Sequence, residues 1–269
     1  MILLISLLAV CFLLYLVITG IVRKPQNINF TCHIKQIAHR VGFKNIAVEN
    51  STAAIIGALK KNIKYFEIDI QLTKDNKLIS FHDEDLLRLA GIDKKITNLT
   101  LEELKSIKLK QENFEANIEE IEEILLLQKK HKFCLFLDVK PAISNNKKYV
   151  TQIYKLLVKH ELIELTCITS FSPAILLYFR LLDKNLTLSQ SVEMTSSNCL
   201  TIFYYHIITS LLPHILGLNF LLIQNDLCSI NFVKKAAQNN IQVLVWTIND
   251  KSEKKYLEKH QIGYLTDIL

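Results

Sequence analysis

From residue 34 onward, short apolar runs alternate with segments of helical periodicity, and this alternation constrains the fold more than any other feature. Such a pattern is typical of repeated βα units and a parallel sheet. Eight strands in about 250 residues match the usual size of one (β/α)8 barrel, so we predict an α/β protein with the TIM-barrel fold. The eight predicted strands span residues 36–40, 65–70, 133–138, 167–171, 186–192, 215–220, 242–247 and 264–266.

Seven helices are expected between these strands, and several carry recognisable start signals. Ser51 and Ser229 are suited to cap helices, and Pro173 is suited to a first helical turn. The long connection after the second strand contains an expected hairpin return at 77–83, with its turn at Asp75-Asn76. The helices are expected to begin near residues 51, 118, 147, 173, 201, 229 and 251.

The composition excludes several classes of function. The chain has only 6 glycines, too dispersed to form a phosphate-binding loop of the Walker-A or Rossmann type. Its 32 Lys and Arg residues exceed its 26 Asp and Glu residues, but the lysines are spread among acids, so no nucleic-acid partner is expected. The 6 cysteines form no C-x-x-C pair, which argues against a zinc ribbon or a thioredoxin-like motif.

Residues 1–22 carry no charged side chain, and about 20 apolar residues span a bilayer. We therefore expect a single transmembrane anchor at 1–22, a linker at 23–33 and one barrel domain at 34–269. A cleaved signal peptide is the alternative, although it would have a basic start and a shorter apolar core. Because Arg23-Lys24 follows the segment, the basic flank and the barrel are expected on the cytoplasmic side.

Three carboxylates mark the ends of predicted strands. Glu67 and Asp69 stand two apart, so in a strand both point to one face, here into the barrel. Asp138 and Lys140 repeat this spacing on the third strand. The alternative is that these carboxylates are solvated strand ends, or that Asp138 only pairs with Lys140. If the three converge, they form an oxygen-rich site for Mg²⁺ or Ca²⁺ rather than for zinc.

Other polar residues fall at the same predicted end of the barrel, where active sites of this fold lie. His39 ends the first strand and His82 ends the hairpin return, which suggests a paired general base and general acid. Arg40 and Lys140 would suit a phosphate group. Trp246 ends the seventh strand, where core packing and a wall for an apolar substrate group are equally expected.

A series of short motifs runs through the chain in order, and it resembles the glycerophosphodiester phosphodiesterase family over residues 34–269. The motifs are Ala38-His39-Arg40, Glu49-Asn50-Ser51, Glu67-x-Asp69, Leu72-Thr73-x-Asp75, Phe81-His82-Asp83, Leu137-Asp138-Val139-Lys140, Ser170-Phe171, Trp246-Thr247-Ile248-Asn249 and Leu265-Thr266-Asp267.

The resemblance implies a (β/α)8 barrel with a small insertion, here about residues 71–117. It implies that His39 and His82 are the acid–base pair, that His82 is also counted as a metal ligand, and that Glu49 supports the first-strand site. In the family's usual mechanism, the neighbouring glycerol hydroxyl attacks phosphorus and the alcohol leaves. Water then opens the cyclic phosphate.

Four positions depart from the family pattern. Val41 replaces a glycine, Val48 replaces a proline, Ser51 replaces a threonine, and Asp138 replaces the usual glutamate. Because both histidines and the Glu-x-Asp pair are intact, we expect an active enzyme that hydrolyses glycerophosphodiesters or lysophospholipids, giving a glycerol phosphate or lysophosphatidic acid and an alcohol. The alternatives are a phospholipase D-like enzyme acting on sphingolipids and a membrane-tethered barrel that binds phosphate or lipid without turnover.

Residues 200–223 carry no charged side chain. We expect them to supply a helix at 201–212 and the sixth strand at 215–220. Such a helix would either be fully buried or contact the membrane through its aromatic and leucine side chains. Contact with the bilayer would favour a lysophospholipid over a soluble diester. The side chains expected at this contact are Phe203, Tyr204, Tyr205, Leu211 and Leu212.

Overall fold

The computed structural model describes residues 30, 33–42, 44–141, 146–194, 205 and 207–269. Within these residues, no helix combines the length and the apolar composition that a bilayer span needs. The transmembrane anchor expected at 1–22 falls outside the described residues.

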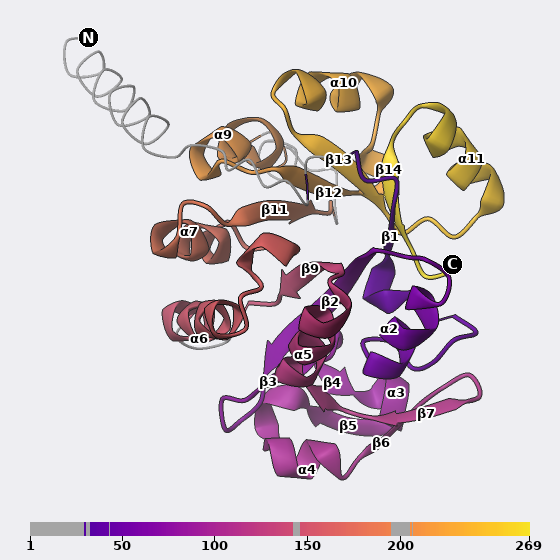
Figure 1. The fold of residues 1–269 in the computed structure, drawn as a ribbon, viewed down its shortest axis with the longest axis vertical. Helices are drawn as coiled ribbons and strands as arrows, with labels where there is room; N and C mark the ends of the chain where they lie inside the picture. Colours follow the sequence, from indigo (N-terminus) through magenta and orange to yellow (C-terminus); the bar gives the residue numbers. More distant parts are fainter. Residues whose placement is uncertain (1–29, 31–32, 43, 142–145, 195–204, 206) are drawn as a thin grey trace.

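Eight parallel strands close into a barrel, which confirms the predicted fold class (Figure 1). Strand β1 pairs with both β14 and β2, and these two pairings close the ring. The strands, in their order around the barrel, are β1 (Gln36–Ala38), β2 (Tyr65–Leu72), β9 (Cys134–Val139), β10 (Thr166–Ser170), β11 (Thr187–Val192), β12 (Phe220–Gln224), β13 (Gln242–Trp246) and β14 (Gly263–Thr266).

Helices surround the barrel, and three of them begin at the residues expected to start them. The Ser51 hydroxyl accepts a hydrogen bond from Ala54 N, the Ser229 hydroxyl accepts one from Phe232 N, and Pro173 lies in the first turn of its helix. The helices are α2 (Thr52–Leu59), α5 (Ile121–His131), α6 (Asn146–Lys159), α7 (Pro173–Leu182), α9 (Leu212–Leu216), α10 (Ile230–Gln238) and α11 (Lys251–Lys259).

The sixth barrel strand was predicted wrongly at 215–220, since it runs over Phe220–Gln224. Ile215 and Leu216 belong to α9, which ends at Gly217 in the left-handed conformation (φ 60°). In a continuous apolar run, periodicity cannot separate a buried helix from a buried strand, and the glycine after the helix was the available signal. Of the helix expected at 201–212, residues 201–204 and 206 lie outside the described residues, and Ile207–Leu211 form the π-helix η5.

The chain between β2 and β9 builds a small antiparallel layer beside the barrel. The expected hairpin is present, because β3 (Leu78–Ser80) pairs antiparallel with β2 and Asn76 occupies the turn with φ 59°. This layer has its own apolar core, which includes Ile79, Phe81 and Leu86. Its other elements are β4 (Asp85–Leu86), α3 (Leu87–Ala90), β5 (Ile92–Lys95), η3 (Ile96–Asn98), α4 (Leu101–Lys105), β6 (Lys108–Gln111), β7 (Phe114–Asn117) and β8 (Glu119–Glu120).

Aromatic rings fill the amino-terminal end of the barrel interior. Phe30 lies in the stretch expected to be a linker, yet its ring is buried, 5.6 Å from the ring of Phe136 and 6.0 Å from that of Phe220. On β2, Phe66 and Ile68 pack outward under the helices, so the alternate residues Glu67 and Asp69 point into the barrel. The polar end of the interior is therefore the carboxyl end of the strands.

Candidate active site

Three buried carboxylates converge at the carboxyl end of β2 and β9, as predicted. Asp69 and Asp138 are directly paired across these two strands, and Glu67 lies two residues before Asp69. One oxygen from each carboxylate lies within 4.8 Å of the others. The second oxygen of Asp138, Oδ1, is buried with no hydrogen-bond partner among the described residues. A hard divalent cation takes oxygen ligands of this kind.

The electrostatics of these carboxylates fit a cation site. Burial and the nearby charges of Asp69 and Asp138 raise the pKa of Glu67 well above its usual value. Burial likewise raises the pKa of Asp138. Burial opposes ionisation of Asp69 as well, but the cations Lys140, His82 and Arg40 outweigh it and lower its pKa. A divalent cation would relieve the repulsion that Glu67 and Asp138 experience.

Lys140 lies between the carboxylates and the barrel mouth. Its Nζ is 2.7 Å from Asp69 Oδ1 and 2.5 Å from Asp138 Oδ2. Although burial lowers the pKa of Lys140, these two carboxylates raise it above its usual value. The Nζ also lies 5.7 Å from the centre of the Phe171 ring. The pairing with Asp138, which was one of the expected alternatives, is therefore present, and the phosphate-binding role of Lys140 stays a prediction.

His39 is held by a carboxylate that we had not assigned to the site. Its Nδ1 donates a hydrogen bond of 2.6 Å to Asp267 Oδ1, while its Nε2 lies 3.9 Å from Glu67 Oε2. Asp267 is itself held by Asn249, whose Nδ2 donates to Asp267 Oδ2 over 2.8 Å. Because the Asp267 carboxylate accepts a hydrogen bond from Nδ1–H, Nε2 is left to face the carboxylate of Glu67.

His82 has an equivalent arrangement. Its Nδ1 donates to Asp83 Oδ1 over 2.7 Å, and Arg88 Nε donates to Asp83 Oδ2 over 2.6 Å. Burial opposes ionisation of Asp83, but these two hydrogen bonds lower its pKa to about 2. Within the described residues, the close group of metal-ligating atoms comprises the three carboxylates and does not include His82. This geometry favours the acid–base role expected for His82.

Glu49 anchors the two arginines of the site. Its buried carboxylate accepts hydrogen bonds from Arg40 Nη1 at 3.2 Å and from Arg88 Nη2 at 2.6 Å. It also accepts one from Gln111 Nε2 at 2.8 Å. The antiparallel layer thus contributes Arg88 and Gln111 to the support of the barrel mouth. Arg40 Nε is buried without a hydrogen bond among the described residues, and it lies 3.8 Å from Asp69 Oδ2, so the guanidinium also pairs with the carboxylate cluster.

A tight turn after β1 brings Arg40 to this position. Arg40 has φ 45°, and its backbone N–H donates to Glu67 Oε2 over 2.8 Å. Val41, which replaces the family's glycine, is also left-handed with φ 74°. This conformation costs a branched residue about 1–2 kcal/mol. The Val41 side chain is completely buried in the core, and this burial offsets the strain.

Trp246 packs in the core, which is the first of the two alternatives expected for it, and its role as a wall for a substrate group stays a prediction. It packs against the aromatic cluster inside the barrel, and its ring stands edge-on to Phe171 at a centroid distance of 5.8 Å. Its Nε1 is buried with no hydrogen-bond partner in the described part of the chain. Trp246 and Phe171 therefore form an edge-to-face aromatic pair where β10 and β13 end.

Several supporting residues were missed by sequence reasoning, although most stand inside the motifs quoted above. Asn50 Nδ2 donates to Asp69 Oδ2 over 2.9 Å, and Asn50 Oδ1 accepts from the backbone of Asp69. The position of Asp83 directly after His82 was an available signal. Arg88 follows the motif Phe81-His82-Asp83 in the series that carries the resemblance, whereas Gln111 gave no signal in the sequence. The residues missed are Asn50, Asp83, Arg88, Gln111, Asn249 and Asp267.

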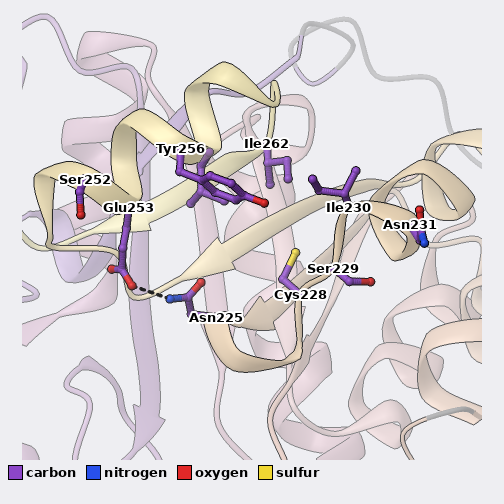
Figure 2. A pocket seen from close by; sticks show the side chains of 10 residues that line it. Asn225, Cys228, Ser229, Ile230, Asn231, Ser252, Glu253, Tyr256 and Ile262 are labelled. Atoms are coloured by element: carbon purple, nitrogen blue, oxygen red, sulfur yellow. Dashed lines mark hydrogen bonds between the residues drawn. The ribbon is translucent and has the colours of Figure 1, made fainter.

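Cavities also lie outside the carboxylate cluster. One of about 750 Å³ opens between α10 and α11, and its lining includes Cys228, Glu253 and Tyr256 (Figure 2). Of the described residues, none of those expected in the site lines this cavity. A second cavity of about 270 Å³ lies between the mouth and the antiparallel layer, and Lys140 lines it together with Asn98. The second cavity is therefore the one adjacent to the site.

Comparison with known proteins agrees with this geometry. Residues 39–267 match the glycerophosphoryl diester phosphodiesterase family. Glycerophosphodiester phosphodiesterase 1 of Homo sapiens is 25% identical over 272 residues, which cover 91% of this chain and 80% of the relative. A glycerophosphodiester phosphodiesterase of Bacillus altitudinis is 35% identical over 114 residues, which cover 40% of this chain and 46% of the relative.

Solved structures share the fold. A phosphodiesterase of Oleispira antarctica, in complex with the product sn-glycerol-3-phosphate, has a TM-score of 0.74 at 23% identity, covering 89% of this chain and 95% of that one. A putative glycerophosphoryl diester phosphodiesterase of Silicibacter pomeroyi has the same TM-score, 0.74, at 16% identity, covering 88% of this chain and 91% of that one.

Proposed function

Because the chain belongs to the glycerophosphoryl diester phosphodiesterase family, a family of phosphoric diester hydrolases, we propose that it hydrolyses glycerophosphodiesters at the barrel mouth. The observation that carries this proposal is the meeting of three buried carboxylates with two histidines at the carboxyl ends of the strands. Each of these histidines is held through Nδ1 by its own aspartate. This arrangement would supply a cation site and two proton carriers, one on each histidine.

Glu67, Asp69 and Asp138 would hold the divalent cation, and both Mg²⁺ and Ca²⁺ accept such oxygen ligands. The bound cation would polarise a phosphoryl oxygen and offset the charge that develops on it. The guanidinium of Arg40 and the ammonium group of Lys140, both next to Asp69, would bind the phosphate from the protein side.

The two histidines would carry the protons. One accepts the proton of the glycerol hydroxyl as that oxygen attacks phosphorus, and the other protonates the departing alcohol. Water then opens the cyclic phosphate with the two roles exchanged. In each histidine, the hydrogen bond from Nδ1 to an aspartate fixes the tautomer that leaves Nε2 available.

We extend the proposal to lysophospholipids and to a membrane location. The uncharged segment 1–22 has the length of a bilayer span, and Arg23-Lys24 behind it favours a cytoplasmic barrel. The aromatic pair of Phe171 and Trp246 would suit the apolar part of a lipid substrate. An anchored barrel meets lysophospholipids at the membrane surface, where they concentrate.

The decisive experiment is a product assay on the full chain in proteoliposomes, with glycerophosphocholine or lysophosphatidylcholine as substrate. We expect release of choline with both substrates, loss of release in EDTA, and recovery on addition of Mg²⁺ or Ca²⁺. Ligand binding without any release under these conditions would instead support a barrel that binds without turnover.

The same assay tests the lipid preference. We expect a higher kcat/KM for lysophosphatidylcholine than for glycerophosphocholine. The ratio of these two kcat/KM values should be smaller in Leu211→Ser protein, because Leu211 is 43% exposed at the expected membrane contact. Ile56→Ser is the matched control, since Ile56 is 44% exposed on α2. A preference of the intact, reconstituted enzyme for glycerophosphocholine would refute the lysophospholipid proposal.

Asp267 is predicted to act as a positioning residue. Asp267→Asn should lower kcat at least about tenfold and leave KM nearly unchanged, because His39 loses the carboxylate that fixes its tautomer and an amide can donate as well as accept. Affinity for Mn²⁺, measured by electron paramagnetic resonance, should stay constant because the carboxylate cluster is untouched. Asp93→Asn, at an exposed position, is the control. A proportional loss of Mn²⁺ binding in Asp267→Asn would indicate a structural role instead.

A further inference from the structure

Helix α7 is apolar on its outer face as well as on its inner face. Ile175, Leu176 and Phe179 are completely buried against the barrel. The exposed positions follow the helical spacing i, i+3, i+4, i+7 and i+8, and all of them are apolar. Leu181 among them is 74% exposed. We call these exposed residues the α7 stripe, and they are Ala174, Leu177, Tyr178, Leu181 and Leu182.

The single charged residue of α7 is turned inward. Arg180 is buried, and its guanidinium donates to the carbonyl oxygens of Lys184, Leu186, Leu216 and Gly217 over distances of 2.6–3.0 Å. A helix on the surface of a globular protein normally shows the opposite distribution, with its charges outward. The apolar character of the α7 stripe is therefore not relieved by any charge of the helix itself.

Neighbouring elements extend the apolar surface. Helix α7 packs between α6 and α9, and the three helices lie next to one another along one side of the barrel (Figure 1). Val158 of α6 is 49% exposed, and Leu211, at the end of η5 just before α9, is 43% exposed. An exposed apolar patch of this kind usually marks a protein or membrane contact.

Cationic side chains lie near the stripe. Lys147 is exposed at the start of α6, on the helical face that carries Tyr154, and the Tyr154 hydroxyl donates to Asp183 at the end of α7. Lys184 is exposed directly after α7. Apolar helices flanked by lysines bind the interface of bilayers that contain anionic lipids. The uncharged segment 1–22 of the same chain has the length needed to span such a bilayer.

We infer that the α7 stripe lies in the headgroup region of an anionic lipid bilayer, so that the barrel rests on the membrane along this side. Phe171 lies between the end of β10 at the mouth and the start of α7. The docked orientation therefore brings the aromatic edge of the mouth close to lipid. The contact between the α7 stripe and the bilayer is measured without any turnover. Its outcome is therefore independent of the proposed hydrolysis.

The test uses tryptophan fluorescence in the full chain. Leu181→Trp and Ile56→Trp are each made in a Trp246→Phe background, which gives one tryptophan on α7 and one on the distant α2. Both proteins are reconstituted in vesicles of phosphatidylcholine and phosphatidylglycerol that carry bromine on the acyl chains. We expect roughly twofold quenching of Leu181→Trp and almost none of Ile56→Trp, because an interfacial helix sits about 5–10 Å into the headgroup boundary.

Two further arms keep the outcome clear. Tyr178→Trp reports on the same stripe should Leu181→Trp fail to fold by circular dichroism. Lys147→Gln/Lys184→Gln, added to Leu181→Trp, should lower quenching in vesicles with phosphatidylglycerol and leave it unchanged in pure phosphatidylcholine. Quenching of the two α7 tryptophans no greater than that of Ile56→Trp would overturn the inference. Shielding of the α7 tryptophans by self-association, seen equally in lipid-free detergent, would assign the stripe to a second copy and overturn it too.

Discussion

Replacing Glu67 or Asp69 by alanine is expected to abolish choline release while leaving the barrel folded. Loss of one ligand from a three-carboxylate site should prevent the cation from binding. The cation would stabilise the transition state by several kcal/mol, so its loss corresponds to at least about a 10³-fold lower rate. The measurement is the product assay in saturating Mg²⁺ or Ca²⁺, together with Mn²⁺ binding by electron paramagnetic resonance. Both variants should lose bound Mn²⁺ in parallel with activity.

The metal-free forms of these two variants should differ in thermal stability. Burial and repulsion raise the pKa of Glu67, so its charged form is disfavoured in the folded protein and Glu67→Ala relieves a cost near neutral pH. Asp69 has a lowered pKa and pairs with Lys140 at 2.7 Å, so Asp69→Ala leaves a buried ammonium with one partner fewer. We expect Tm to be kept or raised in the first variant and lowered in the second.

Glu119→Gln is the matched control for these variants. Glu119 is a partly buried carboxylate with a raised pKa, but it bonds to Thr52 at the start of α2 rather than to the site. It should retain activity and Mn²⁺ binding. Near-normal turnover by Glu67→Ala or Asp69→Ala in the metal-dependent assay would show that the cation is bound elsewhere.

His39→Ala and His82→Ala should each lower kcat by about 10²–10⁴-fold, the usual contribution of a positioned acid or base. The reason is that each imidazole is held through Nδ1 by an aspartate, so each deletion removes one of the two proton carriers. Single-turnover assays with lysophosphatidylcholine measure this loss without interference from product release. The two losses should not add fully in the double variant if both histidines act in the same step.

The other histidines provide the contrast. His33, His131 and His260 are exposed, and their replacement by alanine should leave kcat within about twofold, as is usual for surface substitutions. If these three variants lost activity to the same extent as His39→Ala, the acid–base assignment would have no basis. The same would hold if His82→Ala retained the wild-type rate.

Much of the barrel could be predicted because local signals agree with the fold. Seven of the eight predicted strands overlap the observed ones closely, since apolar runs alternate there with capped helices. The remaining strand, β12, was misplaced because residues 200–223 carry no charged side chain and are apolar over most of their length. In such a largely apolar segment, a helix and a strand would bury their side chains equally well. Tertiary packing therefore decides which of the two forms.

The same distinction holds for the site. The carboxylates Glu67, Asp69 and Asp138 were predictable, because a period of two in a strand places them on one face at the end where strands open. The residues that hold His39 and Glu49 in place could not be predicted in this way. Asp267 lies 228 residues from His39, and Gln111 lies 62 residues from Glu49. Only closure of the barrel brings β14 beside β1, and only the antiparallel layer brings Gln111 to Glu49.

The sequence by itself determined the strand periodicity, the helix caps, the inward-facing acids and the uncharged segment 1–22, because each of these depends on residues a few positions apart. The tertiary structure alone decided which aspartate holds His39 and that Arg180 faces inward. It also decided that the α7 stripe faces outward. In a helix apolar on all sides, the side that is buried depends on what packs against it, and that is set by elements distant in the chain.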